Sequence, residues 1–163
     1  KLMKKDLGRV AMNYENIYVA SIAIGADPKQ AIKAMTEANS YDGPALIVAY
    51  SPCQQHGMPA KLGMSHQADE QRKAVELYRY DPRRAAKGEN PFQLDFKKLK
   101  IQVSEFLEGE NRFAMLDRAN PEKAKMLHEE LQKEVEKRHA ERVRMAMSDK
   151  QLYKELNKSY GKK

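Results

Sequence analysis

The chain has 163 residues, of which 41% are hydrophobic and 33% charged, so it offers enough material for one domain with a solvated appendage. Its net charge of +7 permits a polyanionic partner, but 30 basic residues are interleaved with 23 acidic ones, which makes nucleic-acid binding weakly indicated. No apolar run is long enough to span a bilayer, and the single cysteine excludes an intramolecular disulfide and predicts a reducing, cytoplasmic location.

The amino-terminal part carries the pattern of a βαβ unit after a short helix over residues 4–12. In residues 17–24 and 46–50, apolar residues occur at both odd and even positions, so they would lie on both faces of a strand. This pattern predicts two strands buried on both faces, as in a parallel sheet. Between them, Asp27 and Pro28 form the cap and first turn of a helix that runs to about Asn39. The apolar residues at helical spacing are Leu7, Val10 and Ala11 in the first helix and Ala31, Ile32, Met35 and Ala38 in the second.

Two such strands cannot form a stable sheet alone, because strands buried on both faces need neighbours and covering helices. The chain supplies no further strand of this type, and it begins with Lys1 and not with methionine. The sequence therefore predicts a piece of a longer protein whose partner elements lie upstream.

The middle of the chain is less regular. A loop over residues 54–63 precedes an expected polar helix over residues 65–78, which the Asp81-Pro82 step closes. Residues 90–95 are expected to form a turn that directs Phe92 and Leu94 inward.

Helices dominate the rest of the sequence. Apolar spacing predicts helices over residues 103–108, 111–119 and 121–147, the last one capped by Asn120. Glu134 and Arg138 are four residues apart in the favourable order, and Ser148 with Gln151 has the capping-box pattern for a final short helix. The long helix has only a narrow apolar seam, which indicates that it lies on another surface. The seam consists of Ala124, Leu127, Leu131, Val135 and Val143.

Cys53 is the strongest candidate for chemistry, because its loop follows a strand and the carboxyl edge of an open α/β sheet is where ligands usually bind. A nucleophilic thiolate would require a base such as His56, and a zinc site with His56 and His66 has unsuitable spacing. An iron–sulfur cluster usually takes four thiolates, so one cysteine binds none alone. Composition alone therefore favours a buried inert cysteine over any of these sites. His128 and His139 lie about 16 Å apart along one helix and cannot share a metal, so both are interpreted as surface or seam histidines.

No complete active site can be assembled from these residues. The turn at Gly25-Ala26-Asp27 could hold an anion at a helix amino terminus, but the Asp27 carboxylate would repel it. Paired carboxylates and a glycine-rich phosphate loop are also missing from the sequence.

An ordered set of short segments carries more information than any single motif. The segments are residues 18–20, 24–28, 41–44, 49–53, 77–82, 90–95 and 106–113. In this order they resemble the carboxyl-terminal part of the pyruvate:ferredoxin (flavodoxin) oxidoreductases, within the 2-oxoacid:ferredoxin oxidoreductase family. The resemblance covers nearly the whole chain.

The resemblance implies an α/β fold. Residues 1–95 would be the carboxyl-terminal portion of a thiamine-diphosphate-binding domain with a doubly wound parallel sheet, and residues 96–163 a mainly α-helical extension. The whole enzyme would convert pyruvate and coenzyme A to acetyl-CoA and CO2 and reduce ferredoxin or flavodoxin. It would use thiamine diphosphate, Mg2+ and three [4Fe–4S] clusters, and a homodimer is the implied assembly.

The resemblance also gives Cys53 a role, as the fourth ligand of the cluster nearest the thiamine. The other three ligands, and the motifs for Mg2+, diphosphate and substrate, would lie before Lys1, so no catalytic residue is assigned and the chain alone is expected to be inactive. Residues 74–77 depart from the family pattern. They read Ala-Val-Glu-Leu in this chain and lack the Gly-Tyr-Trp that the family often has just before Leu-Tyr-Arg. The competing hypothesis is a non-enzymatic basic helical module that binds RNA or a partner protein.

Overall fold

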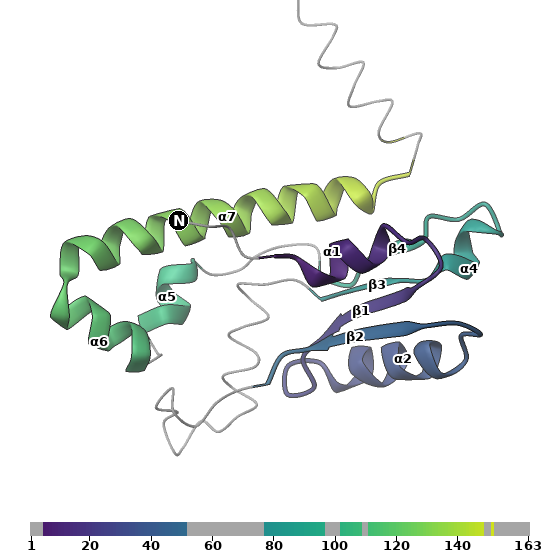
Figure 1. Cartoon of the computed structure of the whole chain (residues 1–163), viewed down its shortest axis with the longest axis horizontal. Helices are drawn as coiled ribbons and strands as arrows, with labels where there is room; N and C mark the ends of the chain where they lie inside the picture. The colour runs from purple at the N-terminus through teal and green to yellow at the C-terminus, as the bar shows by residue number, and fades with distance from the viewer. Residues whose placement is uncertain (1–4, 52–76, 97–101, 109–110, 149–150, 152–163) are drawn as a thin grey trace, which may run out of the picture.

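The computed structural model describes residues 5–51, 77–96, 102–108, 111–148 and 151. Within them the chain forms a four-stranded sheet with helices on both faces and a helical arm (Figure 1). The elements run in the order α1 (Leu7–Met12), β1 (Tyr18–Ile22), α2 (Pro28–Asn39), β2 (Ala45–Ala49), β3 (Tyr78–Tyr80), α4 (Pro82–Ala85), β4 (Phe92–Leu94), α5 (Val103–Glu108), α6 (Asn111–Ala119) and α7 (Pro121–Met145).

The sheet is mixed, with strand order β2-β1-β3-β4. β1 pairs with β2 in parallel, with Tyr18 opposite Ala45, and with β3 in the antiparallel sense. β4 is antiparallel to β3 and therefore runs in the same direction as β1 and β2. The carboxyl ends of β1, β2 and β4 consequently meet at one edge of the sheet.

Two apolar clusters cover the two faces of the sheet. On one face, Tyr18, Ala20 and Ile22 of β1 pack against Ala31 and Ala34 of α2. On the other face, the cluster combines residues of α1, β1, β3 and β4, with three residues near the end of α7 packed against it. Figure 1 shows this layering, with α2 below the sheet and α1 and α7 above it.

The last turns of α7 are fixed to the sheet by polar contacts. The Arg142 side chain is buried, donates a hydrogen bond to Asp6 at 3.0 Å and lies 4.9 Å above the Tyr78 ring. Asn90 donates hydrogen bonds to the carbonyl oxygens of Met145 (2.7 Å) and Met147 (3.0 Å), which satisfies acceptors that a helix end leaves open.

α1 approaches the sheet closely because residue 8 is glycine. A Cβ atom built on Gly8 would overlap the hydroxyl oxygen of Tyr78, whose ring is buried and packs 5.3 Å from Phe92. Any larger side chain at this position would therefore push α1 away from β3.

The amino-terminal half of α7 belongs to a separate, smaller cluster. Val103 and Leu107 of α5 and Val135 of α7 are buried together, with Phe106, Phe113 and Leu131 packed around them. The prediction that the long helix uses a narrow seam on other surfaces is confirmed, since its two halves contact different cores. No helix in the described ranges is long and apolar enough to cross a membrane.

Most element predictions are confirmed. Asp27 caps α2 by accepting a hydrogen bond from the Gln30 N–H at 3.0 Å, and Asn120 caps α7 through the Lys123 N–H. Arg138 donates to Glu134 at 2.9 Å as expected. The Ser148–Gln151 hydrogen bonds are present, whereas the rest of the final helix lies outside the described residues.

Two predictions on the middle of the chain are wrong. Tyr78 lies in strand β3 and not at the end of a helix, and the Asp81-Pro82 step begins α4. The predicted loop over residues 54–63 and residues 65–76 of the predicted helix lie outside the described residues. Residues 92–94, expected as a turn, form strand β4, although Phe92 and Leu94 do point inward. Strand pairing overrides local propensity here, because β3 pairs with β1 and β4 pairs with β3, and these ladders supply hydrogen-bond partners for both three-residue strands.

The expected buried faces of three elements are also partly wrong. In α2 the buried residues are Gln30, Ala31 and Ala34, whereas Ile32 is 65% exposed and Met35 42%. Leu7 and Val10 of α1 are exposed as well. β2, predicted to be buried on both faces, lies at one edge of the sheet among the described strands, and Ala45, Val48 and Ala49 are exposed.

Candidate functional site at the carboxyl edge of the sheet

The candidate site is the edge at which β1, β2 and β4 end. The Tyr50 N–H donates to the Ile22 carbonyl oxygen at 2.9 Å, and the Asp95 N–H donates to the Leu77 carbonyl oxygen at 3.0 Å. These bonds align the ends of the strands. Since Ser51 is the last described residue after β2, the chain enters the Cys53 segment from this edge.

A buried polar network connects this edge to α2. Arg79 of β3 donates from Nη2 to Asp95 Oδ1 at 2.8 Å, from Nε to Asp95 Oδ2 at 2.9 Å, and from Nη1 to Glu37 Oε1 at 2.6 Å. The Tyr18 hydroxyl donates to Glu37 Oε2 at 2.9 Å. Gln30 donates to Asp95 Oδ2 and to the Ser21 carbonyl oxygen. We call Tyr18, Gln30, Glu37, Arg79 and Asp95 the Arg79 network.

The charges of this network are strongly coupled. Burial alone would lower the pKa of Arg79, but its hydrogen bonds to Asp95 and Glu37 raise the pKa above the usual value for arginine. Burial and the hydrogen bond to Glu37 together raise the pKa of Tyr18 far above its ordinary value. The network therefore holds the Arg79 cation between the carboxylates of Glu37 and Asp95. It supports the edge structurally.

A second charged cluster lies at the opposite end of α2. Arg83 of α4 donates to the carbonyl oxygens of Ser40 (3.0 Å) and Glu37 (3.3 Å), where a cation stabilises a helix carboxyl terminus. Arg83 also pairs with Asp81 at 2.8 Å. Burial opposes the ionisation of Asp81, yet the hydrogen bonds from Arg83 lower its pKa below the usual value.

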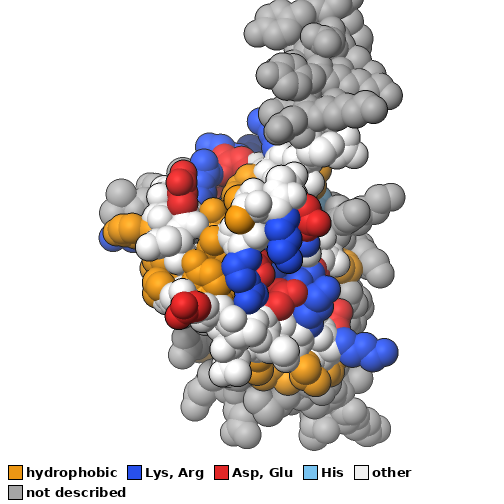
Figure 2. Space-filling model, turned by 90° about the vertical axis from the view of Figure 1, so that its right-hand side faces the viewer, with side chains coloured by type: hydrophobic (Ala, Val, Ile, Leu, Met, Phe, Trp, Pro, Cys, Tyr) orange, Lys and Arg blue, Asp and Glu red, His pale blue; other side chains and the backbone are white. Residues whose placement is uncertain are grey.

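Basic and acidic side chains alternate on the end of the molecule that carries α4. Figure 2 shows this face, with blue and red groups side by side and a hydrophobic area next to them. The ion pairs Arg83–Asp81 and Arg84–Glu89 account for part of the pattern. On this face the positive charge is therefore neutralised locally, which does not favour a polyanionic ligand.

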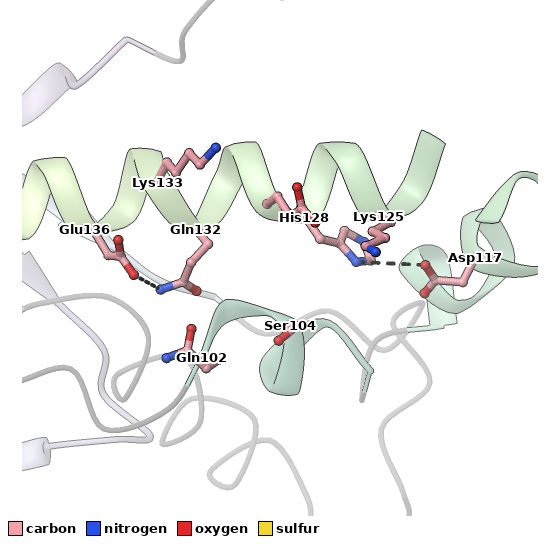
Figure 3. Close-up of a pocket in the computed structure, with 9 residues that line it drawn as sticks. Gln102, Ser104, Asp117, Lys125, His128, Gln132, Lys133 and Glu136 are labelled. Carbon is pink, nitrogen blue, oxygen red and sulfur yellow. Dashed lines mark hydrogen bonds and ion pairs between the residues drawn. The ribbon is translucent and has the colours of Figure 1, made fainter. Parts of the chain in front are cut away.

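A cavity of about 540 Å³ lies where α5 and α6 pack on α7 (Figure 3). The Gln132 side chain accepts a hydrogen bond from the Val103 N–H and donates one to Glu136, both at 2.7 Å. The residues that line the cavity are Gln102, Ser104, Asp117, Lys125, His128, Glu129, Gln132, Lys133 and Glu136.

The chemistry of this cavity is limited. His128 Nδ1 lies 3.9 Å from Asp117 Oδ1, and the ring contacts Phe113 edge-on at 6.3 Å between centroids. The buried His128 Nε2 has no hydrogen-bond partner in the described part of the chain. The cavity thus offers one histidine against a helix seam and no nucleophile–base pair, so the prediction of a seam histidine is confirmed for His128.

The main predicted site residue cannot be compared with the structure. Cys53, His56 and His66 lie outside the described residues. Among the residues that the structure does describe, no group of three or more His, Cys, Asp or Glu side chains could hold a metal ion. The role of Cys53 consequently stays a prediction.

The Arg79 network was not anticipated from the sequence, although a signal was available. In Tyr78-Arg79-Tyr80 a cation alternates with two aromatic residues, which is the period of a strand. A strand interpretation would have placed Arg79 alone on the α2 face, where a buried cation requires carboxylate partners.

Comparison with known proteins gives extensive similarity to one class of enzymes. The chain is 46% identical over 140 residues to the pyruvate-flavodoxin oxidoreductase of Nostoc sp., covering 83% of the chain and 11% of that protein. It is 48% identical over 129 residues to the pyruvate:ferredoxin oxidoreductase of Moorella thermoacetica, covering 76% of the chain and 11% of that protein. No protein-family model matches the chain.

A third relative is named for NADP(+) and not for flavodoxin or ferredoxin. The mitochondrial pyruvate dehydrogenase [NADP(+)] of Euglena gracilis is 44% identical over 133 residues, which cover 78% of the chain and 7% of that protein. The chain therefore spans only a small part of its curated relatives. The segment that these relatives share with the chain occurs in proteins named for flavodoxin, for ferredoxin and for NADP. The shared segment therefore does not determine the electron acceptor.

Proposed function

The chain belongs to the pyruvate:ferredoxin (flavodoxin) oxidoreductase family as a segment that covers 7–12% of the length of these relatives, and we propose that the full-length protein containing it has this activity. In the proposed reaction, pyruvate and coenzyme A give acetyl-CoA, CO2, a proton and two electrons. The electrons pass to ferredoxin or flavodoxin.

The observation that carries this proposal is the identity of 40–49% over most of the chain to several proteins named for the reaction. The test is anaerobic purification of the full-length protein and measurement of viologen dye reduction. We expect reduction that requires both pyruvate and coenzyme A, with acetyl-CoA formed in the ratio of one per two electrons. Dye reduction without coenzyme A dependence, or none with an intact set of cofactors, would contradict the proposal.

The proposal extends to the fold. Residues 1–95 would be the end of a thiamine-diphosphate-binding doubly wound sheet, and residues 96–163 a helical extension. Support comes from the parallel β1–β2 pair with helices on both faces and from the separate cluster of α5, α6 and the first half of α7. Thiamine diphosphate with Mg2+ would supply the electron sink for decarboxylation, and the described residues offer no ligand set for the metal.

We also propose that Cys53 is one of four thiolate ligands of a [4Fe–4S] cluster, the other three lying outside this chain. The proposal rests on the resemblance. It is supported by the position of Tyr50 and Ser51 at the carboxyl edge, from which the chain enters the Cys53 segment. The Arg79 network would then hold the edge rigid behind that segment. None of the described residues is needed as a cluster ligand in this scheme.

From the same resemblance we also propose that the full-length protein is a homodimer and is located in the cytoplasm. Light scattering of the purified full-length protein tests the assembly. Competition between ferredoxin and flavodoxin for electrons tests the acceptor, which the shared segment leaves undecided.

A further inference from the structure

We draw no further inference here: the strongest candidate, the cavity between α5, α6 and α7 beside the buried His128 Nε2, carries nothing because its lining side chains of both charge signs select no class of ligand and nothing in the described part of the chain shows what occupies it.

Discussion

Replacing Arg79 by methionine should open the sheet locally, because it removes a buried cation from two carboxylates. The Arg79 side chain is 6% exposed, and its partners Glu37 and Asp95 are 23% and 17% exposed. Removing one partner of a buried ion pair costs about 3–5 kcal/mol, and we expect the lower end since both carboxylates retain some solvent contact. About 3 kcal/mol corresponds to about two orders of magnitude in an opening equilibrium.

The assay is amide exchange of β3 and β4 in the full-length protein. The Arg79→Met variant should exchange about a hundred times faster than the parent in these strands. Arg9→Met is the control, because Arg9 pairs with Glu141 but is 56% exposed, and a surface pair contributes at most about 1 kcal/mol. Adding Glu37→Gln and Asp95→Asn to Arg79→Met should restore much of the protection. An increase of less than about tenfold in Arg79→Met would refute the reasoning.

Three further predictions concern the packing of the sheet. Because the pKa of Asp81 is lowered by Arg83, ionised Asp81 stabilises the fold above about pH 4, and this contribution is lost as the pH falls through the lowered pKa. Thermal unfolding between pH 7 and 3 should therefore show a smaller acid-induced decrease for Asp81→Asn. Gly8→Ala should destabilise the protein by about 1–3 kcal/mol in denaturant unfolding, since the new methyl group meets Tyr78. Arg142→Leu should release the end of α7 and expose it to limited proteolysis.

Each of these has a control and a contradicting outcome. An unchanged pH profile in Asp81→Asn would mean that the pair with Arg83 carries no acid-sensitive stability. Tyr78→Phe removes the overlapping hydroxyl, so it should reduce the cost of Gly8→Ala, and an equal cost in both backgrounds would reject the steric account. Proteolysis of Arg142→Leu at the parent's rate would show that Arg142 is not needed and that the Asn90 hydrogen bonds and apolar packing hold the end of α7.

The sequence predicted the elements with strong local signals. Asp27-Pro28 and Asn120-Pro121 mark helix starts in the sequence alone, and both caps are present. The parallel strands were predicted because apolar residues occur on both parities. β3 and β4 were missed, because three residues give only a weak period and each strand depends on pairing, β3 with β1 and β4 with β3.

The exposure of Ile32 and Met35 illustrates another limit. Helical spacing indicates which residues lie together, whereas the face that is buried depends on neighbours. In the described residues the small side chains Ala31 and Ala34 face the sheet, since they allow α2 to approach β1 closely. The partners of Arg79 could not be predicted for a related reason: the members of the network are spread over residues 18–95 and meet only in the fold.

The most direct test of the central claim is the iron content and electron paramagnetic resonance spectrum of the full-length Cys53→Ala protein, prepared anaerobically beside the parent. We expect loss of one [4Fe–4S] cluster of three and loss of pyruvate-dependent dye reduction, with the other clusters unchanged. A Cys53→Ala protein that keeps all three clusters and the parent's rate would contradict it.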